Sequence, residues 1–400
     1  MTLNLFLIFG AVFFAFSLIS KRIQGTIITP PILFALGGLL LSRVLAETAG
    51  LTYNEGGLHT LAELTLILVL AADSSQISLS ELRKMKAIPI RLLSIALPLI
   101  IVLGTIVAYL VFPDIGWYQA ALIAAILAPT DAALGASVLA DKNIPLKIRQ
   151  GLNVESGLND GIALPAVLFF ACFLNIHHQS SEENWLVFLS LQLILGPIAG
   201  IIVGWIGGHL IALAAKKNWM TSEFQGVAAI ALAVLAFAVA EACHGNGFIA
   251  AFVAGLTYGN LHVNYSKFLH EFTETESQFL AYLTFFLFGS LILPEAIPHI
   301  TGPIILYACL SLTLVRMLPV ALSMLGMKLG LATTAFMGWF GPRGLASVLF
   351  ALLILEDLHV AQAEFVQTVV ATTVLLSVIL HGLTAAPLSK KLGQTHSAAN

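Results

Sequence analysis

The chain has 400 residues, of which 58% are hydrophobic and only 10% are charged, with a mean hydropathy of +0.96 and a net charge of -3. This leaves too little polar surface to cover a soluble globule of that size, so the composition predicts an integral membrane protein. The charge balance includes no basic arm or patch, which argues against nucleic acid as a partner.

Apolar runs along the chain predict its transmembrane helices, because about 20 helical residues cross the hydrocarbon core of a bilayer. We count thirteen such runs, which predicts an all-α polytopic membrane protein. They lie at residues 3–20, 26–44, 57–75, 88–112, 116–140, 149–175, 185–213, 222–242, 246–260, 277–295, 301–327, 330–355 and 365–388.

The distribution of lysine and arginine agrees with this count. Of the 18 basic residues, 15 fall in alternate loops, whereas the other loops are acidic. Basic loops face the cytoplasm. We therefore expect the N-terminus outside and the C-terminus in the cytoplasm, in the cell membrane.

Two spans contain a proline beside a charge at mid-span. The fifth carries "LAPTDAALG" around Pro129, and the twelfth carries "WFGPRGLAS" around Pro342. Proline interrupts a helix, and unwound backbone at this depth is tolerated only where protein or a cavity surrounds it. A simple kink is the alternative for each. Because both spans are fifth in their half, we predict two inverted six-helix repeats, joined by the seventh span, with broken, crossing helices at a midplane ion site.

Two arginines, Arg316 and Arg343, lie deep in predicted spans, where a charge costs about 2.5 to 3.5 kcal/mol and is expected to be paired. Five acids are candidate partners: Glu63, Asp73, Asp131, Glu155 and Asp160. Five acids and two arginines leave up to three negative charges unbalanced. The sequence therefore indicates that a cation or protons complete the balance.

The segment "ESGLNDG" places four polar residues in the sixth span. Residues four apart share a helix face, so Ser156 accompanies Asp160, and Glu155 accompanies Asn159. The first pair offers a hydroxyl and a carboxylate, hard oxygen ligands suited to Na⁺ or Li⁺. On the second face we expect Glu155 to pair with a buried arginine and Asn159 to bond to the unwound segments.

The broken fifth span is expected to complete the cation site through Asp131 and Thr130. Asp160 can hold either a proton or the cation, so competition between them would give exchange. Because residue 159 is asparagine, one titrating group is expected on this helix. We therefore predict one H⁺ per monovalent cation, unless Asp131 also titrates.

Six segments of the chain form a recognisable set: "PTDAALGASVL", "ESGLNDG", "GNGFIAAFVAGL", "FFLFG", "VRMLPVAL" and "GPRGLAS". Together they resemble the monovalent cation:proton antiporters, in the branch of the NhaP-type bacterial antiporters and the animal sodium/proton exchangers. The resemblance covers nearly the whole chain. It implies a homodimer in which residues 1–86 and 177–295 form a scaffold and dimerisation domain. Residues 87–176 and 296–400 would form a core ion-transport domain that moves like an elevator.

The resemblance also implies roles for individual residues. Asp160 would be the essential ion and proton carboxylate, and Asp131, Thr130 and Ser156 would help to coordinate the cation. Asn159 would stabilise the crossing of the broken fifth and twelfth helices. Glu155 would form an ion bridge with a core arginine, for which we favour Arg316, while Arg343 would hold the break in the twelfth helix.

We therefore expect a secondary antiporter that exchanges Na⁺ or Li⁺ for H⁺ and is neither an enzyme nor dependent on a cofactor. Its partners would be the cation, the proton, membrane lipid and a second copy of the chain. The closest alternative is the same mechanism with K⁺. A channel, an intramembrane enzyme or a purely structural network of buried charges are further alternatives, although the sequence contains neither HExxH nor GxGD.

Overall fold

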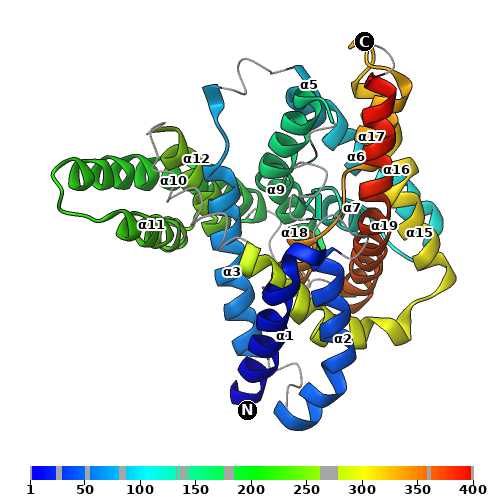
Figure 1. The fold of residues 1–400 in the computed structure, drawn as a ribbon, viewed down its shortest axis with the longest axis horizontal. Helices are drawn as coiled ribbons and strands as arrows, with labels where there is room; N and C mark the ends of the chain where they lie inside the picture. The colour runs from blue at the N-terminus through cyan, green and yellow to red at the C-terminus, as the bar shows by residue number, and fades with distance from the viewer. Residues whose placement is uncertain are drawn as a thin grey trace.

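The computed structural model describes residues 2–23, 29–49, 55–80, 87–131, 134–135, 141, 144–174, 184–261, 278–357 and 362–397. These residues form helices and their connections, with no β-strand among them. Figure 1 shows the arrangement of the helices. The predicted all-α class is confirmed.

The first half of the chain contains α1 (Thr2–Ile23), α2 (Pro30–Ala49), α3 (Glu55–Ser75), α5 (Ala87–Arg91), the π-helix η1 (Leu92–Ala96), α6 (Leu97–Val111), α7 (Trp117–Ile126), α9 (Leu146–Leu174) and α10 (Asn184–Lys216). The second half contains α11 (Ser222–Ala242), α12 (Gly247–Leu261), the helical stretch Gln278–His299 with η3 (Phe288–Ile292), α14 (Leu293–Ala296) and η4 (Ile297–His299), then α15 (Gly302–Leu312), α16 (Leu314–Ser323), α17 (Leu331–Trp339), α18 (Leu345–Asp357) and α19 (Ala363–Ser397).

Seven helical stretches of the described residues are long and apolar enough to cross a membrane: Ala87–Val111, Leu146–Leu174, Ser190–Lys216, Glu223–Ala242, Gln278–His299, Gly302–Ser323 and Ala363–Gln394. Shorter apolar helices occupy other predicted spans, among them Trp117–Ile126 and Gly247–Leu261. Every predicted span overlaps helical residues, but the count of thirteen crossings stays a prediction.

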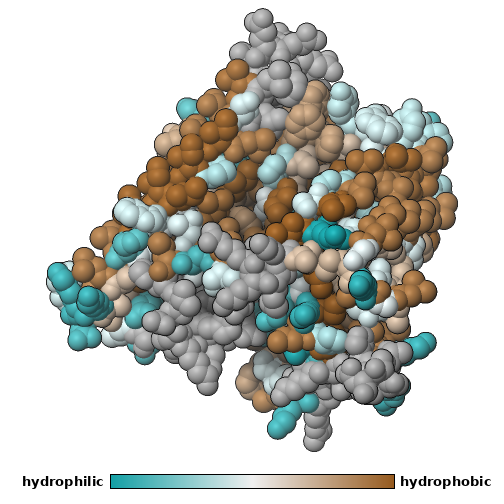
Figure 2. Space-filling model, turned by 90° about the horizontal axis from the view of Figure 1, so that it is seen from above, coloured by the Kyte–Doolittle hydropathy of each residue, from teal (hydrophilic) through white to brown (hydrophobic). Residues whose placement is uncertain are grey.

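The outer surface is unusually apolar, as Figure 2 shows on one face of the molecule. Leu40 of α2 and Leu331 of α17 are 80% and 87% exposed, and many further large apolar side chains are exposed on α1, α6, α10 and α11. Such a surface is costly in water but suits contact with lipid. The structure is therefore that of a multi-pass membrane protein.

Both predicted breaks are present. Helix α7 ends at Ile126, and residues 127–131, which include Pro129, are not helical. Residues 340–344, which include Pro342, separate α17 from α18 in the same way. The two gaps meet, because the backbone N–H of Asp131 donates to the carbonyl of Pro342 at 2.8 Å.

The helices pack in two groups. Helices α10, α11 and α12 pack on one another, and α12 also packs on α3. In the other group, α7 packs against α6 and α9, while α15 and α18 pack against α19. Figure 1 shows the hairpin of α10 and α11 on one side of the molecule and α15, α16, α17 and α19 on the other.

Candidate functional site

Helix α9 carries the polar segment predicted to bind the ion, and the structure buries all four of its polar side chains. Glu155, Ser156, Asn159 and Asp160 are 2%, 9%, 1% and 7% exposed. Buried polar groups are costly unless they are hydrogen-bonded, and buried charges unless they are paired. Their partners therefore show what each residue does.

Glu155 pairs with Arg316 of α16. Arg316 Nη1 donates to Glu155 Oε1 at 2.5 Å, and Nη2 donates to Oε2 at 2.9 Å. Both side chains are almost fully buried. This parallel geometry is the strong, bidentate form of the arginine–carboxylate interaction, and it neutralises one of the buried acids.

Arg343 occupies a different position. Its Nη1 donates to the carbonyl oxygens of Ala128 and of Pro129, the latter at 3.2 Å. These carbonyls belong to the gap after α7, where no further helical turn supplies N–H donors. Ser347 of α18 adds a third such contact, since its hydroxyl donates to the Ile126 carbonyl at 2.7 Å. Residues at the break in the twelfth helix therefore donate hydrogen bonds to the free carbonyl groups at the broken end of the fifth helix.

Asp131 is held by backbone donors from both broken helices. Its Oδ1 accepts the N–H of Leu134 at 3.1 Å, and its Oδ2 accepts the N–H of Leu345 at 2.7 Å. Leu345 is the first residue of α18, so Asp131 acts as a cap at a helix N-terminus, where a negative charge is also favoured by the helix dipole. We expected Asp131 to help coordinate the cation, and this stays a prediction; in the structure each of its oxygens accepts a backbone hydrogen bond, and a carboxylate oxygen has two lone pairs.

Two glycines allow the close approach of these charged groups. A Cβ at Gly344 would overlap the Asp131 carboxylate, and a Cβ at Gly341 would overlap the Arg316 guanidinium. The glycines of the "GPRG" segment are thus required where the unwound backbone packs directly on the two side chains.

Hydroxyl groups join α9 to the gap in the fifth helix. Asn159 Nδ2 donates to Thr130 Oγ1 at 2.7 Å, and Thr130 Oγ1 lies 3.0 Å from Ser156 Oγ. The structure thus brings Asn159 together with Thr130 and Ser156, the two residues whose hydroxyl groups the sequence analysis assigned to the cation. Asn159 bonds across to the unwound segment, in the way expected of it.

Asp160 differs from the other buried acids. Among the described residues its Oδ1 is buried without a hydrogen-bond partner, and the same holds for Oδ1 of the adjacent Asn159. The carboxylates of Asp73 and Asp131 lie close enough to act electrostatically on Asp160. Unpaired buried acceptors in a field of negative charge form a site that suits a bare cation or a proton.

On α3, Asp73 is the acid that acts on Asp160. Glu63 lies ten residues earlier on the same helix, about 15 Å along its axis, and is partly exposed. The excess negative charge around the site therefore comes from three carboxylates, those of Asp73, Asp131 and Asp160, with Glu155 already paired.

The sequence analysis missed three residues that support the breaks: Ser347 of α18 at the fifth-helix gap, and Ser377 and His381 of α19 at the twelfth-helix gap. Ser377 Oγ accepts the N–H of Arg343 at 2.7 Å, and His381 Nε2 lies 2.8 Å from the Trp339 carbonyl. A histidine in an otherwise apolar last span, four residues after a serine, was the available signal.

A different pair, Glu241 and His244, has the spacing of metal ligands, but the structure gives Glu241 another task. Its Oε1 accepts the N–H of Gly247, the first residue of α12, at 2.8 Å. Within the described part of the chain, no three His, Cys, Asp or Glu side chains are grouped to hold a metal ion.

The chain is similar to known proteins over most of its length. The chain is 25% identical over 362 residues to the K(+)/H(+) antiporter NhaP of Alkalimonas amylolytica, covering 88% of this chain and 60% of that protein. It is 27% identical over 346 residues to the Na(+)/H(+) antiporter NhaP of Pseudomonas aeruginosa, covering 81% of this chain and 79% of that protein. The match spans only 48% of the K(+)/H(+) antiporter NhaP2 of Shewanella oneidensis.

The fold also matches a solved structure, that of the sodium proton antiporter MjNhaP1 from Methanocaldococcus jannaschii at pH 8. The TM-score is 0.77 at 20% identity, and the match covers 97% of this chain and 99% of that one. A family model described as "Sodium/hydrogen exchanger, transmembrane" matches residues 7–391. The chain therefore belongs to the family of transmembrane sodium/hydrogen exchangers.

Proposed function

We propose that this chain is a secondary antiporter that exchanges Na⁺ or Li⁺ for H⁺, and that the two ions compete for Asp160. The observation that carries the proposal is the buried Oδ1 of Asp160, which has no hydrogen-bond partner among the described residues and lies beside two interrupted helices. Ser156 lies one helical turn before Asp160 on α9, and its hydroxyl oxygen lies 3.0 Å from that of Thr130, so both could supply oxygen ligands to a cation held by Asp160.

The stoichiometry we propose is one proton for one monovalent cation. The two oxygens of Asp131 accept the N–H groups of Leu134 and Leu345, and these contacts favour its charged form. Glu155 is committed to Arg316. Asp160 has a buried oxygen without a hydrogen-bond partner among the described residues, and exchange at this one carboxylate moves no net charge.

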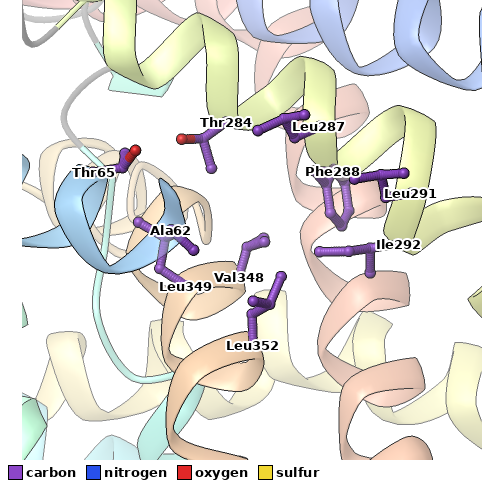
Figure 3. Close-up of a pocket in the computed structure, with 10 residues that line it drawn as sticks. All are labelled: Ala62, Thr65, Thr284, Leu287, Phe288, Leu291, Ile292, Val348, Leu349 and Leu352. Carbon is purple, nitrogen blue, oxygen red and sulfur yellow. The ribbon is translucent and has the colours of Figure 1, made fainter. Parts of the chain in front are cut away.

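Alternating access would come from movement of a core domain, residues 87–176 and 296–400, against a scaffold, residues 1–86 and 177–295. The packing of the helices into two groups supports this division. Figure 3 shows a pocket where the groups meet, lined by α3, the Gln278–His299 stretch and α18. Apart from Thr65 and Thr284, its lining is apolar. Such a lining supplies few polar groups, and a surface with few directional bonds permits sliding.

The proposal places the protein in the cell membrane with its N-terminus outside and its C-terminus in the cytoplasm, as a homodimer surrounded by lipid. The reaction needs no cofactor and no covalent chemistry, since binding, release and conformational change suffice. K⁺ in place of Na⁺ is the second candidate. It is favoured by one observation, that two of the relatives are named K(+)/H(+) antiporters.

Proton flux in proteoliposomes tests the proposal. The vesicles enclose a pH dye, and Na⁺, Li⁺ or K⁺ is added outside, for the wild type, Asp160→Asn and the matched control Asp114→Asn, whose side chain is exposed in the turn before α7. We expect exchange in the wild type and the control but not in Asp160→Asn. Valinomycin with K⁺ on both sides clamps the voltage at zero in the Na⁺ and Li⁺ experiments. A rate that changes on clamping contradicts the one-to-one ratio, and exchange by Asp160→Asn contradicts the site.

A further inference from the structure

The last helix, α19, covers the gap in the twelfth helix with a buried polar stripe. Ser377, His381 and Thr384 follow one another at four- and three-residue spacing, which places them on one helix face. Ser377 and His381 are 0% and 1% exposed. Burying a hydroxyl and an imidazole in an apolar helix is costly unless both are hydrogen-bonded, so their partners are informative.

His381 holds the end of α17. Its Nε2 lies 2.8 Å from the carbonyl oxygen of Trp339, the last residue of that helix. A carbonyl can only accept a hydrogen bond, so Nε2 carries the proton and donates. The same carbonyl accepts the N–H of Gly341 at 2.8 Å in the tight turn at Phe340. The imidazole also stacks on the Trp339 indole, with ring centroids 4.9 Å apart.

Ser377 holds the other end of the gap. Its Oγ accepts the backbone N–H of Arg343 at 2.7 Å. The indole of Trp339 adds a third tie, because its Nε1 donates to Thr384 Oγ1 at 2.9 Å. The loop from Trp339 to Arg343 is therefore fastened to α19 at its first and last residues.

The opposite side of this loop faces the cation site. The Pro342 carbonyl accepts the N–H of Asp131 at 2.8 Å. The Arg343 side chain donates to the carbonyls of Ala128 and Pro129, directly before Thr130. A shift of the loop would consequently move Asp131 and Thr130, which lie next to Asp160.

The inverted repeats give these residues a counterpart. Helix α9 follows the broken fifth helix, and α19 follows the broken twelfth helix. The Ser156 and Asp160 pair of α9 has the same four-residue spacing as Ser377 and His381 of α19. Asp160 has an oxygen without a partner among the described residues, whereas both ring nitrogens of His381 have one: Nε2 donates to the Trp339 carbonyl, and Nδ1 lies 3.2 Å from the Ser377 hydroxyl, which can donate to it. Helix α9 thus keeps a buried acceptor for the ion, and α19 uses a serine and a histidine of the same spacing for support.

We propose that His381 and Ser377 are positioning residues of the cation site, which they hold in place through the Trp339 carbonyl and the Arg343 N–H. This inference rests on the proposed antiport function. The support requires only a hydrogen-bond donor at the position of His381 Nε2, because its partner is the carbonyl of Trp339. A side-chain amide at position 381 should therefore replace the imidazole, whereas an apolar side chain should not.

The test compares His381→Gln, His381→Leu and Ser377→Ala with His209→Leu in the same proteoliposome assay. His209 is a matched control because it is exposed on α10, contacts its own helix carbonyl at Trp205 and packs against the Trp205 ring at 4.5 Å. We expect the KM for the cation to rise roughly tenfold in His381→Leu and Ser377→Ala, the size of effect that follows loss of a buried hydrogen bond. His381→Gln and His209→Leu should keep the wild-type KM and the wild-type pH profile.

Amide hydrogen exchange of residues 340–347 supplies a measurement that does not depend on transport. Exchange should be faster in His381→Leu and Ser377→Ala, and unchanged in His381→Gln, with the amides of α12 unchanged in every variant as a check on folding. A wild-type KM in His381→Leu overturns the proposal. An equal rise of the KM in His381→Gln and His381→Leu overturns it as well. A shifted pH profile in His381→Gln also overturns it, because His381 would then titrate during transport. Failure of the wild type to exchange ions would instead refute the antiport function, while hydrogen exchange still reports on the support of the gap.

Discussion

Arg316 and Glu155 are 161 residues apart in the sequence and meet through two parallel hydrogen bonds, of 2.5 and 2.9 Å, in a fully buried position. The pair joins α16 to α9 beside the residues that we assign to the cation. Gly341 of the twelfth-helix gap packs directly on the same guanidinium. Three of the helices around the site are thereby tied together at one point.

Removing one member of this pair should destabilise the protein strongly. Glu155→Gln leaves a buried guanidinium without its counter-charge, which typically costs about 3 to 5 kcal/mol. We expect a clearly lower melting temperature in detergent. Arg316→Gln should behave alike, and the double variant should lose less than the sum of the two, because no charge is then left unpaired. Additive losses would show that the pair is not coupled.

Asp131→Asn tests the role of Asp131 as a cap for both broken helices. The amide can accept only one of the N–H groups of Leu134 and Leu345, and its NH₂ group must face the other donor. Losing such a cap costs about 1 to 2 kcal/mol, so we expect a lower melting temperature together with a higher KM for the cation. An effect on KM without any change in stability would instead favour direct coordination of the cation by Asp131.

Gly344→Ala tests the close approach at the crossing. The added methyl group would overlap the Asp131 carboxylate, so the backbone of the gap has to move. We expect loss of most of the exchange activity, measured in proteoliposomes. Gly135→Ala is the matched control, since a Cβ there meets no atom of the described residues within 4 Å. Equal activity in the two variants would refute the tight packing.

The pH dependence of the cation affinity tests the competition at Asp160. Protons displace the cation, so the KM for the cation should rise as the pH falls. With a single competing proton the rise approaches about tenfold per pH unit on the acidic side and levels off on the alkaline side. A slope near two on a logarithmic plot would mean that a second carboxylate, such as Asp73, takes up a proton in the same step. Asp73→Asn should then restore a slope of one.

The sequence predicted that a core and a scaffold domain meet, but it did not predict which residues face each other where they meet. The sequence analysis treated Asp73 and Glu63 alike, as candidate partners of the buried arginines, because both lie on the same apolar helix. In the structure Asp73 acts on Asp160, whereas Glu63 lies about three helical turns away along α3. Helical periodicity alone does not decide which turn of a helix faces a distant carboxylate.

Local rules were sufficient for much of this protein. Apolar runs determined the helices and the membrane class, because a span needs its own length of hydrophobic residues. Pro129 and Pro342 determined where two helices break, because proline cannot continue the hydrogen-bond pattern. The four-residue spacing in "ESGLNDG" determined which polar residues share a face of α9, and the excess of buried acids pointed to a cation.

Only the tertiary structure decided how these parts are connected. It chose Arg316 over Arg343 as the partner of Glu155, engaged both oxygens of Asp131 with backbone N–H groups, and brought Ser377 and His381 to the gap in the twelfth helix. Such choices depend on which helix faces meet after packing, between residues as far as 214 positions apart in the sequence. No local preference of the chain encodes those distances, whereas the need to satisfy every buried donor and acceptor in an apolar interior selects one arrangement.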